Sequence, residues 1–294
     1  MRIRAVGPLF EELYCRFNKP ALIYPDPLVF AHQYDDPADR EVAALVAACL
    51  AYGTVKQIHA SVAAALGHMG PSPAAYVSTR APGMMARDFA GFTHRFTSGA
   101  ELARLLAGVG RVMARHGSLG ACFSAGMRED DETVLPALTV FINALGGGSG
   151  LKFLLPSPER GSACKRLLLY LRWMVRRDAV DPGCWAGVPA AKLVMPMDTH
   201  IHRFARETGI TRRASADMKA ALDVTAFFRC IAPGDPVRYD FALTRLGMRR
   251  NEETRAQRRE LVTAVCAAMK DLEKAGAHMR VHSPRPALAA RIQR

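Results

Sequence analysis

At residues 196–203 the chain reads Pro-Met-Asp-Thr-His-Ile-His-Arg. The acidic residue Asp198 lies just after a proline and just before a run of helical period, so it is predicted to begin a helix. Aspartate is a favoured residue at that position because its carboxylate accepts a backbone N–H group, and capping alone therefore accounts for Asp198. His200 and Arg203 are predicted on the exposed side of this helix, opposite its apolar residues.

A second decisive stretch lies one helix upstream, where residues 158–165 read Pro-Glu-Arg-Gly-Ser-Ala-Cys-Lys. A turn at Gly161 precedes a helix predicted over residues 162–177, and Lys165 lies at its start. The backbone N–H groups of a tight turn at a helix N-terminus bind anions such as phosphate. The field there opposes the charge of a lysine and favours the neutral amine that a Schiff-base nucleophile needs. A surface lysine without a role is the simpler alternative.

Helical periodicity extends over nearly the whole chain, and no strand-like alternation is longer than a few residues. The sequence therefore predicts an all-α fold. Residues 37–52, almost wholly apolar after the first turn, are predicted to form a central buried helix. Residues 88–96 have no long period and are predicted as a loop with aromatic anchors. The other predicted helices cover residues 8–18, 55–68, 99–116, 118–127, 132–145, 162–177, 198–208, 217–231, 235–246 and 253–275, with a short one ending near residue 78.

Two stretches bear on domain organisation. Residues 146–150 read Gly-Gly-Gly-Ser-Gly and mark either a lobe boundary or a plain linker. From residue 276 onward the chain is basic, contains prolines and is poor in apolar residues. We therefore expect one two-lobed helical domain over residues 1–275 and a mobile basic tail over residues 276–294.

The composition favours a polyanionic partner, because the formal net charge is +13. Nucleic acid is the first candidate and an anionic membrane the second, although the Arg and Ala bias explains part of the charge without any function. The seven cysteines are scattered and form no Cys-x-x-Cys pair, which argues against disulfides, zinc and iron–sulfur clusters. No apolar run is long enough to cross a bilayer. The sequence thus predicts a cytoplasmic protein without a cofactor or a membrane partner.

Together, the segments around Lys165 and Asp198 resemble the helix-hairpin-helix DNA glycosylase superfamily, the endonuclease III and 8-oxoguanine glycosylase group. In that family a glycine-rich hairpin holds a DNA phosphate, a lysine follows at the start of the second helix, and an aspartate follows at the next helix start. The separation of 33 positions between Lys165 and Asp198 is similar to that in the archaeal 8-oxoguanine glycosylase branch. Along nearly its full length the chain also resembles an uncharacterised bacterial family of glycosylase-like proteins, through residues 162–167, 171–176 and 196–200.

The resemblance implies a two-lobed helix-hairpin-helix fold and a DNA glycosylase of base excision repair, with or without lyase activity at abasic sites. A damaged or modified nucleotide would be flipped out of the DNA stack into a pocket. Asp198 would stabilise positive charge on the sugar or deprotonate the nucleophile, and Lys165 would attack C1′. The implied DNA contacts are Gly161, Ser162, Ala163, Arg166, His200 and Arg203. Base-stacking surface is expected from Trp173, Trp185 and the loop with Phe89 and Phe92.

The chain departs from the family pattern at two places. Ala163 stands where the hairpin usually has its second glycine, and the four-cysteine cluster loop of endonuclease III is missing. Two alternatives therefore stay open beside a monomeric glycosylase. One is a glycosylase fold that binds nucleic acid without catalysis. The other is a metal-dependent hydrolase that uses Asp198, His200 and His202.

Overall fold

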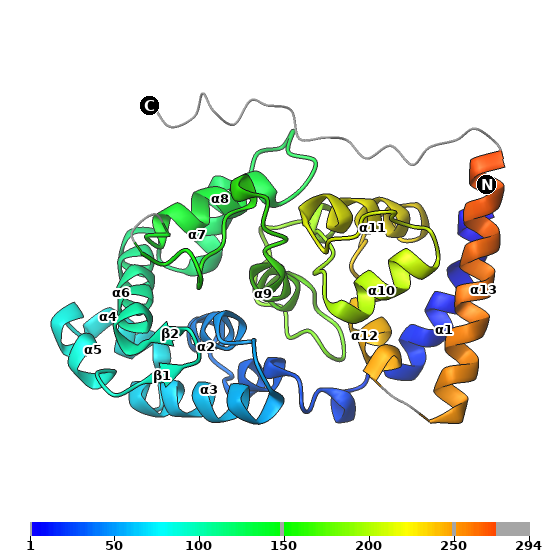
Figure 1. Cartoon of the computed structure of the whole chain (residues 1–294). Coiled ribbons are helices and arrows are strands. Elements are labelled where there is room, and N and C mark those ends of the chain that lie inside the picture. The colour runs from blue at the N-terminus through cyan, green and yellow to red at the C-terminus, as the bar shows by residue number, and fades with distance from the viewer. Residues whose placement is uncertain (1, 148–149, 249–250, 275–294) are drawn as a thin grey trace.

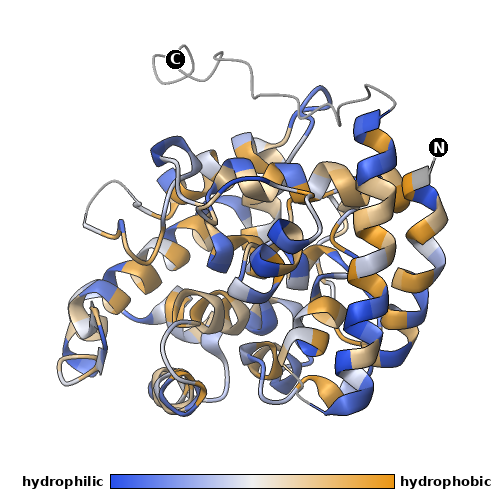
Figure 2. Ribbon diagram, turned by 45° about the vertical axis from the view of Figure 1, so that its right-hand side comes forward, coloured by the Kyte–Doolittle hydropathy of each residue, from blue (hydrophilic) through white to orange (hydrophobic). Residues whose placement is uncertain are grey.

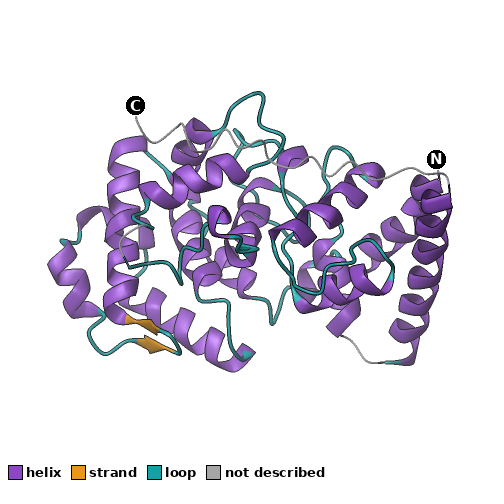
Figure 3. Ribbon diagram, turned by 45° about the horizontal axis from the view of Figure 1, so that its top comes forward, coloured by secondary structure: helices purple, strands orange, loops and turns teal. Residues whose placement is uncertain are grey.

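The computed structural model of the chain describes residues 2–147, 150–248 and 251–274, and in this part of the chain helices dominate (Figure 3). The single sheet of the described residues is a hairpin of two short strands, β1 (Thr93–His94) and β2 (Thr97–Ser98). The predicted all-α class is confirmed. The α-helices are α1 (Gly7–Phe17), α2 (Pro37–Cys49), α3 (Val55–Met69), α4 (Pro73–Thr79), α5 (Pro82–Asp88), α6 (Gly99–His116), α7 (Leu119–Gly126), α8 (Leu135–Ala144), α9 (Lys165–Val175), α10 (Thr199–Glu207), α11 (Met218–Ile231), α12 (Asp240–Met248) and α13 (Glu252–Lys274).

Short 3-10 helices connect several of these elements. They are η1 (Arg2–Val6), η2 (Pro20–Leu22), η3 (Pro27–Gln33), η4 (Pro158–Arg160) and η5 (Ala190–Lys192). Both η2 and η3 begin with a proline, whose fixed φ suits a 3-10 turn.

The helices gather on two sides of α9, which lies in the middle of the molecule (Figure 1). Helices α2 to α8 lie on one side, and α10 to α13 lie on the other. The N-terminal η1 and α1 pack against α11, α12 and α13, so the two ends of the described chain build one side together. Residues 148–149 of the predicted lobe boundary and the predicted tail, residues 276–294, lie outside the described residues.

The central helix α9 is buried on most of its circumference. Residues 167 and 168 and every residue from 170 to 174 are buried. The start of α9 lies at the end of α2, where the Arg166 guanidinium donates to the Cys49 carbonyl oxygen. The other end of α9 lies near the start of α2, because Trp185 bonds both the Met174 carbonyl oxygen and Glu41. The two central helices therefore run antiparallel.

Most helix starts follow from the local sequence. Helix α6 begins with a capping box of Ser98 and Glu101, and its predicted span of residues 99–116 is confirmed. Helix α12 starts at Asp240, five residues later than predicted, after a series of turns. Residues 82–98 form α5 and the β hairpin, where the sequence predicted a loop over residues 88–96. The hairpin was missed because its strands are too short to show alternation.

The ribbon colours in Figure 2 alternate between hydrophilic and hydrophobic along most helices, as amphipathic helices around a shared core require. One continuous cluster of buried apolar side chains runs through both sides of the molecule. Among the described residues, no helix is both long and apolar enough to pass through a membrane.

Candidate active site

Asp198 caps the N-terminus of α10, as predicted. Its Oδ1 accepts the backbone N–H of Ile201 at 2.7 Å, and its Oδ2 accepts the hydroxyl of Thr244 at 3.0 Å. The preceding residues 193–197 are buried, and the apolar face of α10 packs inward through Ile201, Phe204 and Ala205. Two donors therefore fix the orientation of the carboxylate of Asp198, a residue that is partly exposed.

Helix α12 supports Asp198 and His200 from one side. Thr244 bonds Asp198, and Gly247, one turn further along α12, lies against His200. A Cβ atom at Gly247 would come within 2.7 Å of His200 Nδ1, so only glycine permits this close packing of α10 on α12. The exposed Arg203 lies 3.5 Å from the same nitrogen. The prediction that His200 and Arg203 share one side of α10 is consistent with this contact.

The hairpin before α9 contains two residues in the left-handed region. Gly161 has a φ of 74° and is exposed, with open space around the position of a Cβ atom. Cys164 has a φ of 48°, which is uncommon for a residue with a side chain. The Ser162 hydroxyl accepts the Cys164 N–H at 3.2 Å, and Ala163 packs against the core. The missing second glycine therefore does not prevent a tight turn in this hairpin.

Turns rather than a helix precede this hairpin. Helix α8 ends at Ala144, and residues 151–157 form turns and irregular chain. Helix α9 follows the hairpin directly, as the resemblance requires. Of the two helices that the family places around its hairpin, only the second adjoins it here.

Lys165 is the first residue of α9 and is partly exposed. In the described part of the chain, α9 is the one helix among α1 to α11 that begins with neither a capping side chain nor a proline in its first turn. The N–H groups of its first turn therefore lack the partner that a capping residue supplies. An uncapped helix start beside a lysine is suited to a phosphate.

An ion pair joins α9 to α12, the helix whose Thr244 bonds Asp198. Arg172 lies two helical turns after Lys165, on the same face of α9. Its guanidinium forms a buried ion pair with Asp240, one turn before Thr244 on α12. The pKa of Asp240 is raised to about 6, mainly by burial and in part by the charge of Asp198, while the charge of Arg172 acts in the opposite direction.

No hydrogen bond or ion pair within the described residues joins Lys165 directly to Asp198. The aspartate and the lysine lie at the starts of two different helices, α10 and α9. Their pairing as catalytic partners stays a prediction.

The side chain of Arg166, which was predicted to contact a DNA phosphate, bonds backbone carbonyl groups. Its guanidinium donates to the carbonyl oxygens of Cys49 and Phe153. It also lies over the rings of Tyr52 and Phe153, at 5.0 and 4.7 Å from their centroids. The residue satisfies a carbonyl group at the end of α2, which has no partner within that helix. Its contact with a phosphate stays a prediction.

The residues proposed as a metal set do not converge. His202 Nε2 bonds the Arg213 carbonyl oxygen at 3.1 Å, while His200 faces Gly247. No three His, Cys, Asp or Glu side chains among the described residues lie close enough together to hold a metal ion.

Three of the four aromatic residues predicted to stack on bases are buried instead. Trp173 and Phe89 are fully inaccessible, and Trp185 is 6% exposed. Phe92 is partly buried against the core. The prediction failed because α9 contacts both sides of the molecule, so that no face of it around Trp173 is free. Two aromatic side chains that are exposed are Phe96 and Phe153, and the ring of Phe153 lies under the guanidinium of Arg166.

A buried histidine fixes the β hairpin to the rest of the molecule. His94, which is 2% exposed, bonds Ser61 Oγ at 2.8 Å and the Tyr52 carbonyl oxygen at 3.0 Å. Because a carbonyl oxygen only accepts, Nε2 carries the proton and Nδ1 accepts the Ser61 hydroxyl. Burial lowers the pKa of His94, so the neutral ring is the form that holds the hairpin.

We expect the hairpin to make the fold sensitive to mild acid. Below about pH 6.5, the ordinary pKa of histidine, an unfolded chain binds a proton that buried His94 resists, so stability is lost as the pH falls. The free energy of unfolding, measured in urea from pH 7.5 to pH 5, should therefore fall more steeply for the native protein than for His94→Gln. If the free energies of unfolding of the native protein and His94→Gln differ by the same amount at every pH in this range, the prediction is wrong.

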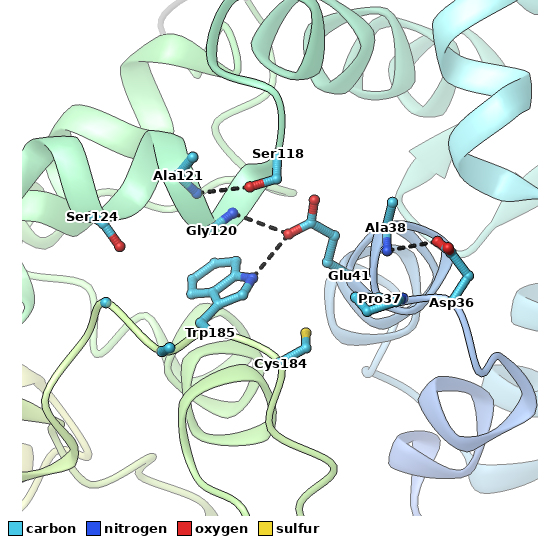
Figure 4. A pocket seen from close by; sticks show the side chains of 12 residues that line it. Asp36, Pro37, Ala38, Glu41, Ser118, Gly120, Ala121, Ser124, Cys184 and Trp185 are labelled. Atoms are coloured by element: carbon cyan, nitrogen blue, oxygen red, sulfur yellow. Dashed lines mark hydrogen bonds between the residues drawn. The ribbon is translucent and has the colours of Figure 1, made fainter.

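A half-open cavity of about 470 Å³ lies at the starts of α2 and α7 (Figure 4). At its base, the Glu41 carboxylate accepts the N–H groups of Leu119 at 2.8 Å and Gly120 at 3.0 Å, and the Trp185 indole N–H at 2.9 Å. Burial raises the pKa of Glu41, against the effect of these donors. The carboxylate thereby caps α7 and anchors Trp185.

This cavity is separate from the Lys165 and Asp198 region. It lies near the C-terminal end of α9, which has 11 residues, so roughly 16 Å of helix separates it from Lys165. The sequence interpretation did not include Glu41. Its signal was a single acid in the otherwise apolar run of residues 41–51.

The comparisons with known proteins identify a family without adding an activity. No curated protein and no solved structure matches the chain. Residues 26–249 match the model of a family described as "Protein of unknown function (DUF2400)". The matched range includes Lys165, Asp198 and Thr244. Since the match covers well over half of the chain, the protein belongs to the DUF2400 family.

Proposed function

We propose that this protein is a DNA N-glycosylase of the base-excision type, with Asp198 as the catalytic carboxylate. The observation that carries the proposal is the environment of Asp198. It is partly exposed and oriented by the Ile201 N–H and the Thr244 hydroxyl of α12, and α12 is in turn ion-paired through Asp240 with Arg172 of α9, the helix that starts at Lys165. A carboxylate held in one orientation stabilises positive charge that develops on a sugar in front of it.

Lys165 is proposed as the nucleophile. Its amine would attack C1′ while the glycosidic bond breaks, and the departing base would take the bonding electron pair and a proton. The C1′–O4′ bond would then break, with O4′ taking the electron pair and a proton, so that the opened sugar is held as an imine. The imine would permit β-elimination, in which the C2′ proton leaves and the bond from C3′ to its oxygen breaks. The strand would then be nicked on the 3′ side of the lost base.

The proposed phosphate contacts are of two kinds. The N–H groups at the start of α9 and the turn at Gly161 would bind one DNA phosphate, which their lack of a capping partner supports. Exposed Arg203 and partly exposed His200 would position the strand on the side of α10. These contacts fix the position of the strand and carry no sequence preference.

Borohydride trapping tests the role of Lys165. The protein is incubated with oligonucleotides that contain an abasic site or oxidised bases, and sodium borohydride reduces any imine to a stable adduct. We expect an adduct with the native protein, none with Lys165→Ala, and an undiminished amount with Lys219→Ala, an exposed lysine on α11. Adducts of equal amount for the native protein and Lys165→Ala would show that another amine reacts.

The same panel separates the alternatives. Base release that survives Lys165→Ala and is lost in Asp198→Asn would identify a glycosylase without lyase activity. Binding that falls steeply with salt, without base release from any lesion, would instead identify a nucleic-acid-binding protein with no catalysis.

A further inference from the structure

Three aromatic rings meet at the tip of the β hairpin, and two of them are open to solvent. We call Tyr52, Phe96 and Phe153 the aromatic patch. Phe96 is 69% exposed and Phe153 is 40% exposed, whereas Tyr52 is partly buried behind them. Single exposed apolar residues are common on protein surfaces, but two adjacent exposed rings with a third behind them form a patch.

The rings of the patch support one another. The Phe96 ring is nearly parallel to that of Tyr52, at 8° and 6.5 Å between centroids. The Phe153 ring stands edge-on to both, at 5.7 Å from Phe96 and 4.9 Å from Tyr52. The exposed face of Phe96 is therefore the outer end of a short aromatic stack.

The backbone holds Phe96 in place. Phe96 follows Arg95, whose φ of 52° is the left-handed conformation that a residue with a side chain seldom adopts. Buried His94 fixes the strand before it, and the Tyr52 hydroxyl lies 2.7 Å from both the His94 carbonyl oxygen and the Thr97 hydroxyl. The hairpin lies at the edge of the molecule (Figure 3). A strained and well-anchored turn thus presents an aromatic ring to solvent, although burial would have stabilised that ring.

The surroundings of the patch are mainly positive. The Arg95 guanidinium lies 5.5 Å from the Phe96 ring centre, and that of Arg166 lies over the two other rings. Lys152, next to Phe153 in the chain, is exposed. The acid Glu101 contributes to the raised pKa of Tyr52, after burial, and its carboxylate accepts hydrogen bonds from the Ser98 N–H and hydroxyl in the capping box of α6. Cations around an exposed aromatic stack favour a partner with both negative charge and flat apolar faces.

We propose that the aromatic patch stacks on an unpaired base of a nucleic-acid strand, with Phe96 as the stacking residue. Arg166 lies over two rings of the patch and directly follows Lys165 in the chain, so the patch adjoins the start of α9. This inference rests on the proposed function and adds a substrate class to it: strands with unpaired bases beside the reacting nucleotide bind more tightly than fully paired duplex. Base–aromatic stacking is tolerant of sequence, so no preference among the four bases is expected.

Binding measurements test the stacking directly. Fluorescence anisotropy gives the Kd for a labelled 20-nucleotide single strand and for the matching blunt duplex, in the Asp198→Asn background so that turnover does not interfere. We expect the single strand to bind more tightly. Phe96→Ala should weaken single-strand binding by about 5- to 150-fold, the factor that corresponds to the usual range of one base–aromatic stack.

Matched variants distinguish stacking from simple apolar contact. Phe96→Trp should retain the affinity, whereas Phe96→Leu, which is apolar but has no ring, should lose most of it. Val140→Ala removes another exposed apolar side chain, 48% exposed on α8, and should leave the affinity unchanged. An oligonucleotide with 2-aminopurine gives a second readout, because stacking of that base quenches its fluorescence. Circular dichroism and the Tm confirm that each variant is folded.

The outcomes separate this inference from the proposed function. If Phe96→Ala binds the single strand as tightly as the native protein, or if Phe96→Trp loses as much affinity as Phe96→Ala, the stacking proposal is wrong. Neither result bears on catalysis by Lys165 and Asp198, which the borohydride and base-release experiments test. A patch that binds anionic lipid vesicles, and not oligonucleotides, through Phe96 would also overturn it. If the native protein binds neither single strands nor duplex, the proposed function and this inference fail together.

Discussion

Asp198→Asn is expected to lower the rate of base release by about 10²- to 10⁴-fold, the usual contribution of a catalytic acid or base. The substitution removes the negative charge that would stabilise the sugar cation and changes little else in the side chain. An asparagine in that place still accepts the Ile201 N–H through its oxygen, and asparagine caps helices as well as aspartate does. The Thr244 hydroxyl accepts from the new amide after turning its proton away.

The measurement is the release of base from a panel of oligonucleotides with oxidised, alkylated or deaminated bases, under single-turnover conditions. The expected change in the free energy of unfolding is below about 1 kcal/mol, because the cap is retained. Asp217→Asn is the matched control, since Asp217 caps α11 through the Ala220 N–H at 2.8 Å and lies outside the candidate site. Unchanged base release in Asp198→Asn on a substrate of the native protein would show that Asp198 is only a helix cap.

Arg172→Met is expected to lower the free energy of unfolding by about 3–5 kcal/mol, the usual cost of breaking a buried ion pair on one side. Arg172 lies between Asp181 and Asp240, and all three side chains are at most 3% exposed. Without Arg172, Asp240 becomes a buried carboxylate with no cation beside it. The substitution also removes the ion pair between α9 and α12, the helix that orients Asp198 through Thr244.

The pH dependence of this effect has a definite sign. Burial already raises the pKa of Asp240 to about 6, and the loss of Arg172, whose charge lowers it, would raise it further. The native form of Arg172→Met then binds a proton more readily than the native form of the unmodified protein. Its deficit in stability should therefore shrink as the pH falls from 8 to 5. Urea unfolding at several pH values measures this difference.

Two controls make the second experiment decisive. The double variant Arg172→Met/Asp240→Leu replaces both charges by apolar side chains and should recover most of the loss, as paired apolar replacements do. Arg212→Met removes a cation that is 85% exposed and paired with Glu273, and should cost less than about 1 kcal/mol. A loss in Arg172→Met no larger than that in Arg212→Met would show that the buried network does not stabilise the fold.

The sequence alone was sufficient where neighbouring residues decide the outcome. The capping box at Ser98, the Asp198 cap and the apolar periodicity of α6 and α11 involve residues within one or two helical turns. The apolar periodicity of residues 162–177 also predicted α9, although residues 162–164 belong to the hairpin. The positions of Asp198 and Lys165 at two helix starts therefore needed no tertiary information.

Only the tertiary structure decided what those residues meet. Asp198 and Thr244 are 46 positions apart, and Arg172 and Asp240 are 68 apart, so no local pattern links them. The same reason explains why Trp173 is buried and Phe96 is exposed. Composition marks both as aromatic, but exposure depends on which helices pack around them. Helical period and capping are properties of a few neighbouring residues, whereas a site is formed by side chains that meet only after the whole chain has folded.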